Sequence, residues 1–446
     1  MNNVTRLPAT VRLVLLLAHL LAYGYALRTG RYVFPDTDRY VQAAYNLGHY
    51  GRLYARPLPA GPPTGQAVQE LTIRPPGYPL LVLALGAANG RRVAGMLLLQ
   101  NALSYLVLAS VLRGWAATRA RPPGRGAWAL ALLLALSFPA QLIYANAVMS
   151  ELPLQALLWL GAGLLVRAWA TGRASWLAGA GAALVGAFLL KPVMYPGVAV
   201  FALGAAGLAW RWRRGALLGL GLLPLALAAA YCAWNGQRTG YVHFSSISTI
   251  NLLHYNAAGV LRQAEGPAAE DAWLTAALRR AAAQPTFAAR QQVLHAAAWA
   301  VLRRYPLHYA GQHLLGTAAF FLDPGRFDLS VVGGYARTAG LLAALRGRGA
   351  AGVLAGLRGQ PPELLVVLLL VAAANSARLL LAGRALFATS RPRPRAGDWL
   401  QLATPAGRWV AVGLLLYLAL LTGPLGAARF LVPGYPLLLA LALRAV

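Results

Sequence analysis

Long apolar segments alternate with short polar segments along most of this chain. Many of the apolar runs approach the ~20 residues that an α-helix needs to cross the hydrocarbon core of a membrane. Within a run the apolar residues are continuous, whereas the strands of a membrane barrel alternate lipid-facing and lumen-facing residues. The pattern therefore predicts an all-α, polytopic membrane protein.

About ten to twelve spanning helices are expected on this pattern. The predicted spans are 11–27, 93–112, 127–146, 152–169, 175–190, 195–210, 215–234, 362–387, 408–423 and 430–445. The run 305–322 is either a further span or a helix on the membrane surface, and 340–358 is read as interfacial. Three regions follow: a transmembrane module over 1–235 that includes the outer loop 28–92, an extracytoplasmic or interfacial helical region over 236–361 with helices at 267–283 and 286–304, and C-terminal transmembrane helices over 362–446.

Positive charge predicts the orientation of these helices. The net charge is +29, although only 11% of the residues are charged and 59% are hydrophobic. Arginines cluster at 113–125, 167–173 and 211–214, while the alternate turns hold a single cation, Lys191. The arginine-rich side is therefore expected to be cytoplasmic. The basic charge marks topology rather than nucleic-acid binding, because no soluble basic domain or stacking platform is visible.

The polar stretch 34–79, directly after the first span, is the most informative part of the chain. It holds Asp36 and Asp38, two of only eleven acidic residues. A helix is predicted over 36–47, with the Asp36 carboxylate accepting the free amides of its first turn and Gly48 suited to stop it. A second, shorter helix is predicted over 76–88. The simplest interpretation is that both aspartates only cap a surface helix; the alternative is a catalytic role.

Four other charged residues are expected on the same outer side. Glu151 begins a span, and Lys191, the one lysine among 40 Lys and Arg residues, ends another. Arg74 precedes two prolines that fix its backbone, and Arg429 stands at the outer start of the last span. Each alone is typical of a membrane-interface anchor. Together, a carboxylate can accept a proton from a hydroxyl while the cations hold a phosphate.

Several other kinds of chemistry are not indicated. The seven histidines show no metal-ligand spacing. His243 and His254 are interpreted as loop surface, with contact to a substrate as the alternative. Cys232 lies in an apolar run, which predicts a small core residue rather than a disulfide. No phosphate-binding P-loop or dinucleotide fingerprint stands in a suitable context. The first apolar segment is expected to be a retained span rather than a signal peptide.

The order of these charged residues resembles the GT-C class of integral-membrane glycosyltransferases, in particular the branch of protein O-mannosyltransferases and lipid A aminoarabinose transferases. The family pattern places an Asp after the first span with a Tyr four residues later, here Asp36 and Tyr40. A basic residue with Pro-Pro follows, here Arg74, and its segment ends in Tyr78. Later come an acid in the second outer loop, a basic residue after the fifth span, and an Arg with a nearby Pro, matched by Glu151, Lys191, and Arg429 with Pro433.

This resemblance implies a GT-C-like fold and an inverting transfer of a sugar from a polyprenyl-phosphate donor to a lipid, glycan or protein acceptor, outside the cytoplasm. Asp36 would be the catalytic base, and Asp38 would assist it or bind a metal. Arg74, Lys191, Arg429, Tyr40 and Tyr78 would bind the donor and its phosphate. Glu151 would orient the donor or, with Asp36, hold a divalent cation. Thr37 stands where relatives often have a second acid, which leaves metal use open.

The expected location is a bacterial inner membrane, with the active site facing the periplasm or exterior. Two alternatives remain open from the sequence: a transporter or flippase of lipid-linked glycans, and a cell-envelope glycan polymerase or ligase. A transporter is expected to place ionisable residues near the bilayer midplane, whereas here they stand at the ends of spans.

Overall fold

The computed structural model describes residues 7–89, 92–335, 349, 351–352, 354–356, 358, 360–387, 400–401 and 404–446. Within these ranges the regular structure is helical and no strand occurs. The protein is therefore an all-α polytopic membrane protein, as predicted. Only scattered residues of the segment 340–358 are described, so its interfacial position stays a prediction.

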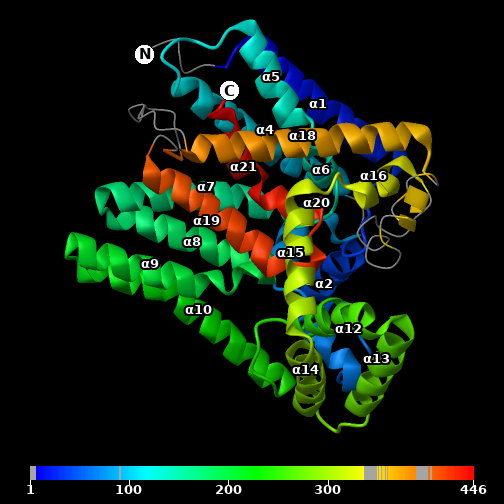
Figure 1. The fold of residues 1–446 in the computed structure, drawn as a ribbon. Helices are drawn as coiled ribbons and strands as arrows, with labels where there is room; N and C mark the ends of the chain where they lie inside the picture. Colours follow the sequence, from blue (N-terminus) through cyan, green and yellow to red (C-terminus); the bar gives the residue numbers. More distant parts are fainter. Residues whose placement is uncertain are drawn as a thin grey trace.

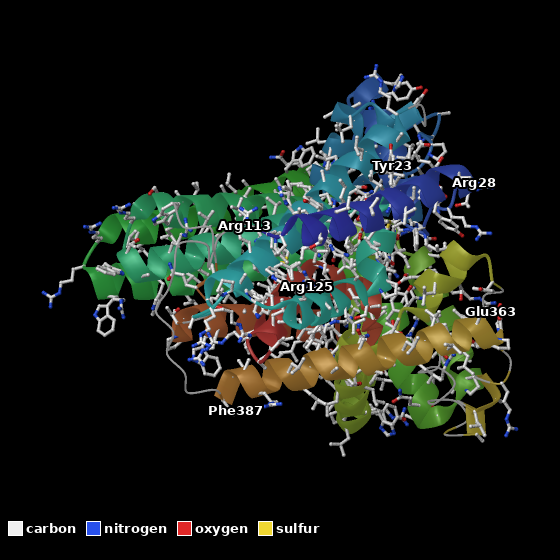
Figure 2. All side chains as sticks on the ribbon, turned by 90° about the horizontal axis from the view of Figure 1, so that it is seen from above. Tyr23, Arg28, Arg113, Arg125, Glu363 and Phe387 are labelled. Atoms are coloured by element: carbon white, nitrogen blue, oxygen red, sulfur yellow. The ribbon has the colours of Figure 1, made fainter. Side chains whose placement is uncertain are left out.

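Seven helices in the described ranges are long and apolar enough to cross a membrane. They are α1 (Ala9–Thr29), α4 (Val93–Ala117), α7 (Glu151–Thr171), α9 with the turn before it (Pro192–Trp212), α10 (Gly215–Thr239), α18 (Pro362–Phe387) and α19 with the turn after it (Pro405–Leu425). Shorter apolar helices are α8 (Ala174–Leu190) and the last segment, Ala428–Leu443, which contains α20 (Ala428–Leu431) and α21 (Tyr435–Leu443). Seen from above, α18 crosses the bundle from Glu363 to Phe387 (Figure 2).

The predicted span 127–146 is not one straight helix. It is divided into α5 (Arg125–Leu136) and α6 (Pro139–Ala145), which meet at 59°. Pro139 opens α6, where its missing N–H costs no helical hydrogen bond. Arg378 of α18, fully buried, donates from Nε to the Leu134 carbonyl at 2.9 Å and from Nη2 to the Ser137 hydroxyl at 2.7 Å. A buried guanidinium thus satisfies backbone that the bend leaves free.

Three helices of the central region form a second hydrophobic core apart from the bundle. They are α12 (Ala258–Glu265), α13 (Pro267–Ala282) and α14 (Phe287–Arg304), close to the helices predicted over 267–283 and 286–304. Their core is centred on Val260, Leu261, Val301 and Leu302. In Figure 1 they lie at the lower right, below the long helices, and α15 (Pro306–Leu322) connects them to the bundle. We call α12–α14 the helical cap.

The polar loop after α1 folds into α2 (Thr37–Tyr50), the short helix η2 (Gly65–Leu71) and α3 (Gly77–Ala84). The predicted capping of α2 by Asp36 is wrong, because the Asp36 side chain accepts no hydrogen bond from the first turn. Its carboxylate binds arginines instead. The predicted stop at Gly48 is also wrong: α2 runs on to Gly51, whose left-handed φ of 63° suits glycine, while Gly48 lies inside the helix against Leu83.

Candidate functional site

Five charged residues from separate segments meet at one end of the bundle. Asp36 precedes α2, Arg74 precedes α3, Glu151 opens α7, Lys191 follows α8 and Arg429 lies in α20. We call these five residues the charge cluster. They all stand at the ends of apolar helices or in the loops between them. The structure brings together the acidic and basic groups that the sequence placed on one side.

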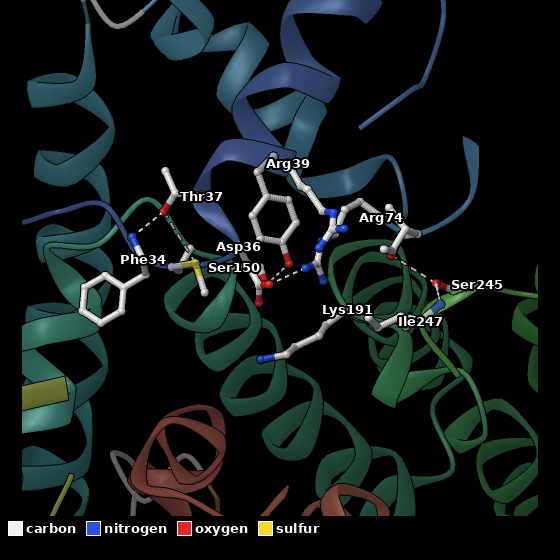
Figure 3. A network of polar contacts seen from close by, with 12 residues as sticks. Phe34, Asp36, Thr37, Arg39, Arg74, Ser150, Lys191, Ser245 and Ile247 are labelled. Carbon is white, nitrogen blue, oxygen red and sulfur yellow. Dashed lines mark hydrogen bonds and ion pairs between the residues drawn. The ribbon is translucent and has the colours of Figure 1, made fainter. Parts of the chain in front are cut away.

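Arg429 bridges the two carboxylates of the charge cluster. Its Nη2 donates to Asp36 Oδ2 at 2.6 Å and its Nε to Glu151 Oε1 at 2.6 Å. Arg74 Nη2 donates to the other Asp36 oxygen at 2.5 Å, and Lys191 Nζ donates to Glu151 Oε1 at 2.7 Å. Figure 3 shows the Arg74 guanidinium beside Asp36 and the end of the Lys191 side chain below it. Three cations therefore surround two carboxylates.

The charge cluster is closed at Glu151 and open at Asp36. The Glu151 side chain is 0% exposed, whereas those of Asp36 and Arg429 are 21% and 20% exposed. Glu151 Oε2 is buried and has no hydrogen-bond partner among the described residues. A ligand would therefore reach the charge cluster from the Asp36 side, with Glu151 holding the cations from behind.

Two buried tyrosines fix Arg74. Its guanidinium lies 5.0 Å from the ring centre of Tyr40, a cation–π distance. The Tyr40 hydroxyl is within hydrogen-bond distance of Ser150 Oγ at 3.2 Å, and the ring edge of Tyr78 packs on it at 4.7 Å. Both rings are at most 1% exposed. They position Arg74, and their predicted contact with a donor stays a prediction.

The electrostatics of Asp36 follow from its two arginines. Burial alone would raise the pKa of the Asp36 carboxyl, but the positive charges of Arg74 and Arg429 outweigh burial and hold this pKa well below its ordinary value. Asp36 is thus ionised at neutral pH. While both guanidiniums hold it, it is a weak base, because the same contacts that lower its pKa compete with a proton.

Asp38, predicted to assist Asp36, lies outside the charge cluster. It is exposed, and neither a hydrogen bond nor an ion pair ties it to the described part of the cluster. The cation site considered at Asp36 and Glu151 does not fit the observed donor set. Both Asp36 oxygens and Glu151 Oε1 already hold guanidinium or ammonium groups, and the described residues contain no group of three or more His, Cys, Asp or Glu side chains placed for a metal.

Two further acids near Arg429 were missed by sequence reasoning. Asp323 Oδ2 accepts the backbone N–H of Ala428 at 2.8 Å, and Asp328, in α16 (Arg326–Gly333), accepts the Tyr144 hydroxyl at 2.7 Å. Burial raises the pKa of Asp328 to about 7. The scarcity of acids in this chain, which drew attention to Asp36, applies equally to Asp323 and Asp328 and could have identified them.

An apolar cavity of about 620 Å³ opens beside the charge cluster, between α7, α8, α9 and α19. Its wall includes Met194 and Gly197, within six residues of Lys191, and extends along the helices to Trp169 and Trp409. The Tyr417 hydroxyl, also in the wall, donates to the Val193 carbonyl at 2.6 Å and fixes the turn after Lys191. None of the five cluster residues lines this cavity, but the turn Pro192–Met194 leads directly from Lys191 to its wall.

Comparison with known proteins returned no match: no family model, no curated protein and no solved structure matches this chain. The resemblance to the GT-C class therefore rests on the order and placement of the motif residues alone.

Proposed function

We propose that this protein is a glycosyltransferase that moves a sugar from a polyprenyl-phosphate donor to an acceptor hydroxyl on the extracytoplasmic side of the membrane, with inversion. The observation that carries the proposal is the convergence of Asp36, Arg74, Glu151, Lys191 and Arg429 in one ion-pair network. A base beside several phosphate-binding cations at a membrane surface suits this reaction.

In the proposed reaction, the acceptor oxygen attacks the anomeric carbon on the face opposite the phosphate. A new C–O bond forms, the bond from the anomeric carbon to the phosphate oxygen breaks, and the phosphate leaves with the electron pair. Asp36 takes the hydroxyl proton. Arg74, Lys191 and Arg429 stabilise the charge that grows on the phosphate, and Glu151 holds Lys191 and Arg429 in place.

The ion pairs of the charge cluster suggest how donor binding makes Asp36 a stronger base. A donor phosphate competes with the Asp36 carboxylate for Arg74 and Arg429, since guanidinium forks bind both kinds of oxyanion. Binding would weaken the contacts that depress the Asp36 pKa, and the carboxylate would become a stronger base once the substrate is in place. No metal step is needed in this scheme.

The apolar cavity supports a lipid-linked donor in particular. A polyprenyl chain is apolar along its length and needs a hydrophobic path that starts at the phosphate. The cavity runs between spanning helices, and the turn that follows Lys191 contributes Met194 to its wall. The placement of the charges at helix ends also favours a surface enzyme over a transporter, whose ionisable groups are expected near the midplane.

The test compares cell-envelope glycans and glycolipids by mass spectrometry in cells with the wild-type protein, without it, and with single variants. Loss of the protein is expected to remove one sugar modification. Asp36→Asn should lower transfer on the order of 10²-fold or more, the scale for removing a positioned base. Asp38→Asn is the matched control, because it removes an exposed acid two positions away, and it should transfer near normally.

Near-normal transfer by Asp36→Asn, in protein that is folded and present at wild-type levels, would contradict the assignment of the base. Loss of the envelope glycan together with accumulation of the complete lipid-linked glycan on the cytoplasmic side would instead favour a flippase.

A further inference from the structure

A second cavity lies between the helical cap and the loop that carries the charge cluster. It has a volume of about 590 Å³, within the usual range for small-molecule sites. Its polar wall includes three arginines and three glutamines, contributed by α2, η2, α13 and α14: Arg39, Arg279, Arg290, Gln66, Gln69 and Gln291. Ser246, Thr249, His254 and Thr275 also line it. No acidic residue is among the residues that line it.

The positive charge of this cavity is largely uncompensated. Arg39 is neutralised from behind by Glu70, which its Nε and Nη2 contact at 3.3 and 3.2 Å. In contrast, none of the ion pairs found in the described residues involves Arg279 or Arg290. Arg290 is held by backbone carbonyls instead, donating from Nε to Gln284 at 3.1 Å and from Nη2 to Ala282 at 2.9 Å. These neutral contacts orient its guanidinium without cancelling its charge.

Gln291 is an independent indication of a ligand. Its side chain lines the cavity and the residue is only 5% exposed, yet no hydrogen bond to it is found within the described part of the chain. The Gln291 amide is not among the fully enclosed polar atoms that lack a partner, so it keeps access to the space of the cavity. A ligand with hydroxyl or anionic oxygens would supply those partners.

The cavity also adjoins the charge cluster. Arg39 stands three residues after Asp36, about one helical turn away. The loop between the cavity and Arg74 is fixed by two serines: Ser246 Oγ donates to the Gln69 carbonyl at 2.8 Å and Ser245 Oγ to the Ile73 carbonyl at 3.2 Å. Figure 3 shows Arg39 beside Arg74, with Ser245 on the far side of Arg74. A molecule held in the cavity would therefore have one end near Asp36.

We propose that this cavity binds the acceptor, and that the acceptor is a carbohydrate bearing a phosphate or carboxylate group. Guanidinium forks suit those oxyanions, and glutamine amides suit sugar hydroxyls. The identification as acceptor site depends on the proposed function, whereas the binding of an anionic sugar does not.

The test measures binding of glucose 6-phosphate, glucuronate and uncharged glucose to the purified full-length protein by isothermal titration, without any donor. Either or both anionic sugars should bind more tightly than glucose, and affinity should fall as NaCl is raised, because exposed charge contacts are screened. Arg279→Gln and Gln291→Leu should each weaken binding about tenfold or more, the scale for losing a hydrogen bond in a charged contact. Arg280→Gln is the matched control: it removes the charge of the neighbouring arginine, which is also exposed but does not line the cavity, and it should change affinity less than twofold.

Equal binding of glucose and the anionic sugars, no binding of any probe, or equal losses in Arg279→Gln and Arg280→Gln would each overturn the proposal. Repeating the titration with Asp36→Asn separates it from the proposed function. Retained binding in a protein that transfers no sugar leaves the anionic-sugar site standing and removes only its role as acceptor site. In an active protein, Arg279→Gln should raise the KM for an anionic acceptor and leave kcat unchanged.

Discussion

Replacing Glu151 by glutamine should destabilise the protein strongly, because it leaves a buried ammonium group without a counter-charge. Glu151 is fully buried and accepts from Lys191 and Arg429. Arg429 keeps Asp36 as a second partner, but the described residues offer Lys191 no other acid within ion-pair distance. Removing one partner of a buried pair typically costs about 3–5 kcal/mol. We expect Glu151→Gln to lower the unfolding free energy by about that amount.

A double-mutant cycle isolates the pairwise part of this loss. Lys191→Met should cost about 1.5–3 kcal/mol, the scale for a hydrogen bond to a charged group, since Glu151 keeps Arg429. The double variant should lose less than the sum of the two single variants by at least about 1 kcal/mol, because it no longer buries an unpaired ammonium. The measurement is the unfolding free energy from SDS titration in mixed micelles, followed by tryptophan fluorescence.

The control is Glu265→Gln, the same change in an exposed pair. Glu265 lies 3.6 Å from Arg304, their side chains are 35% and 72% exposed, and Glu265 also accepts the Tyr305 hydroxyl, a hydrogen bond that glutamine can keep. Such pairs contribute about 0–1 kcal/mol. If Glu151→Gln were no more destabilising than Glu265→Gln, or if the Glu151 and Lys191 variants were additive, the claim that this pair is buried and coupled would fail.

Three further predictions concern other parts of the structure. For Asp328, whose pKa rises from about 3.8 to about 7 on folding, the stabilising contribution is fully present below about pH 4 and is lost as pH rises to 7, by about 4 kcal/mol at 1.36 kcal/mol per pKa unit. Asp328→Asn should remove this slope in unfolding curves between pH 4 and 7, and an unchanged slope would assign it to another group. Arg378→Lys should cost about 3 kcal/mol or more in unfolding free energy despite keeping the charge, because a single ammonium cannot reach Leu134, Ser137 and Asn375 together. Wild-type stability in this variant would show that the bend between α5 and α6 does not need the guanidinium group. Gly316→Ala should lower the unfolding free energy by at least about 1–3 kcal/mol, because the new Cβ would lie 2.0 Å from the Gly423 carbonyl oxygen. Gly311→Ala in the same helix meets nothing within 4 Å and should be neutral or slightly stabilising. Equal effects in the two variants would contradict the close approach of α15 to Gly423.

The fold class could be predicted from the sequence because it depends on the length of each apolar run, which is local information. The bend between α5 and α6 could not, because the guanidinium that satisfies it comes from Arg378, about 240 residues later. An arginine in the middle of an apolar run also gives no sign of which carbonyls it will meet. The same limit applies to Asp36: the local rule for helix capping was overridden by Arg74 and Arg429, which only the folded chain brings near.

The charge cluster was predictable to a different degree. The rarity of acids and of lysine, combined with the sidedness of the spans, selected Asp36, Glu151 and Lys191. Arg74 and Arg429 were selected by their position, before two prolines and at the start of the last span, and the structure brings all five residues into contact. The sequence could not show which of these residues would pair with one another, for example that Arg429 bridges two carboxylates. The cavity beside the helical cap was also beyond reach. Its wall joins α2 and η2 to α13 and α14, and His254, read from the sequence as loop surface, is part of it.

The charge count of the cluster bears on the order of events in the proposed reaction. Three cations and two carboxylates leave a surplus of one positive charge, which matches the single negative charge of a sugar–phosphate diester. After transfer, the leaving phosphate is a monoester with a charge of about −1.5 to −2 at pH 7. If Asp36 keeps the proton it has taken, the surplus of the cluster rises to two and again matches the bound phosphate. Proton transfer to Asp36 would thus stabilise the departing phosphate as well as the attacking oxygen. The single carboxylate held between Arg74 and Arg429 would then both activate the acceptor and balance the charge of the product.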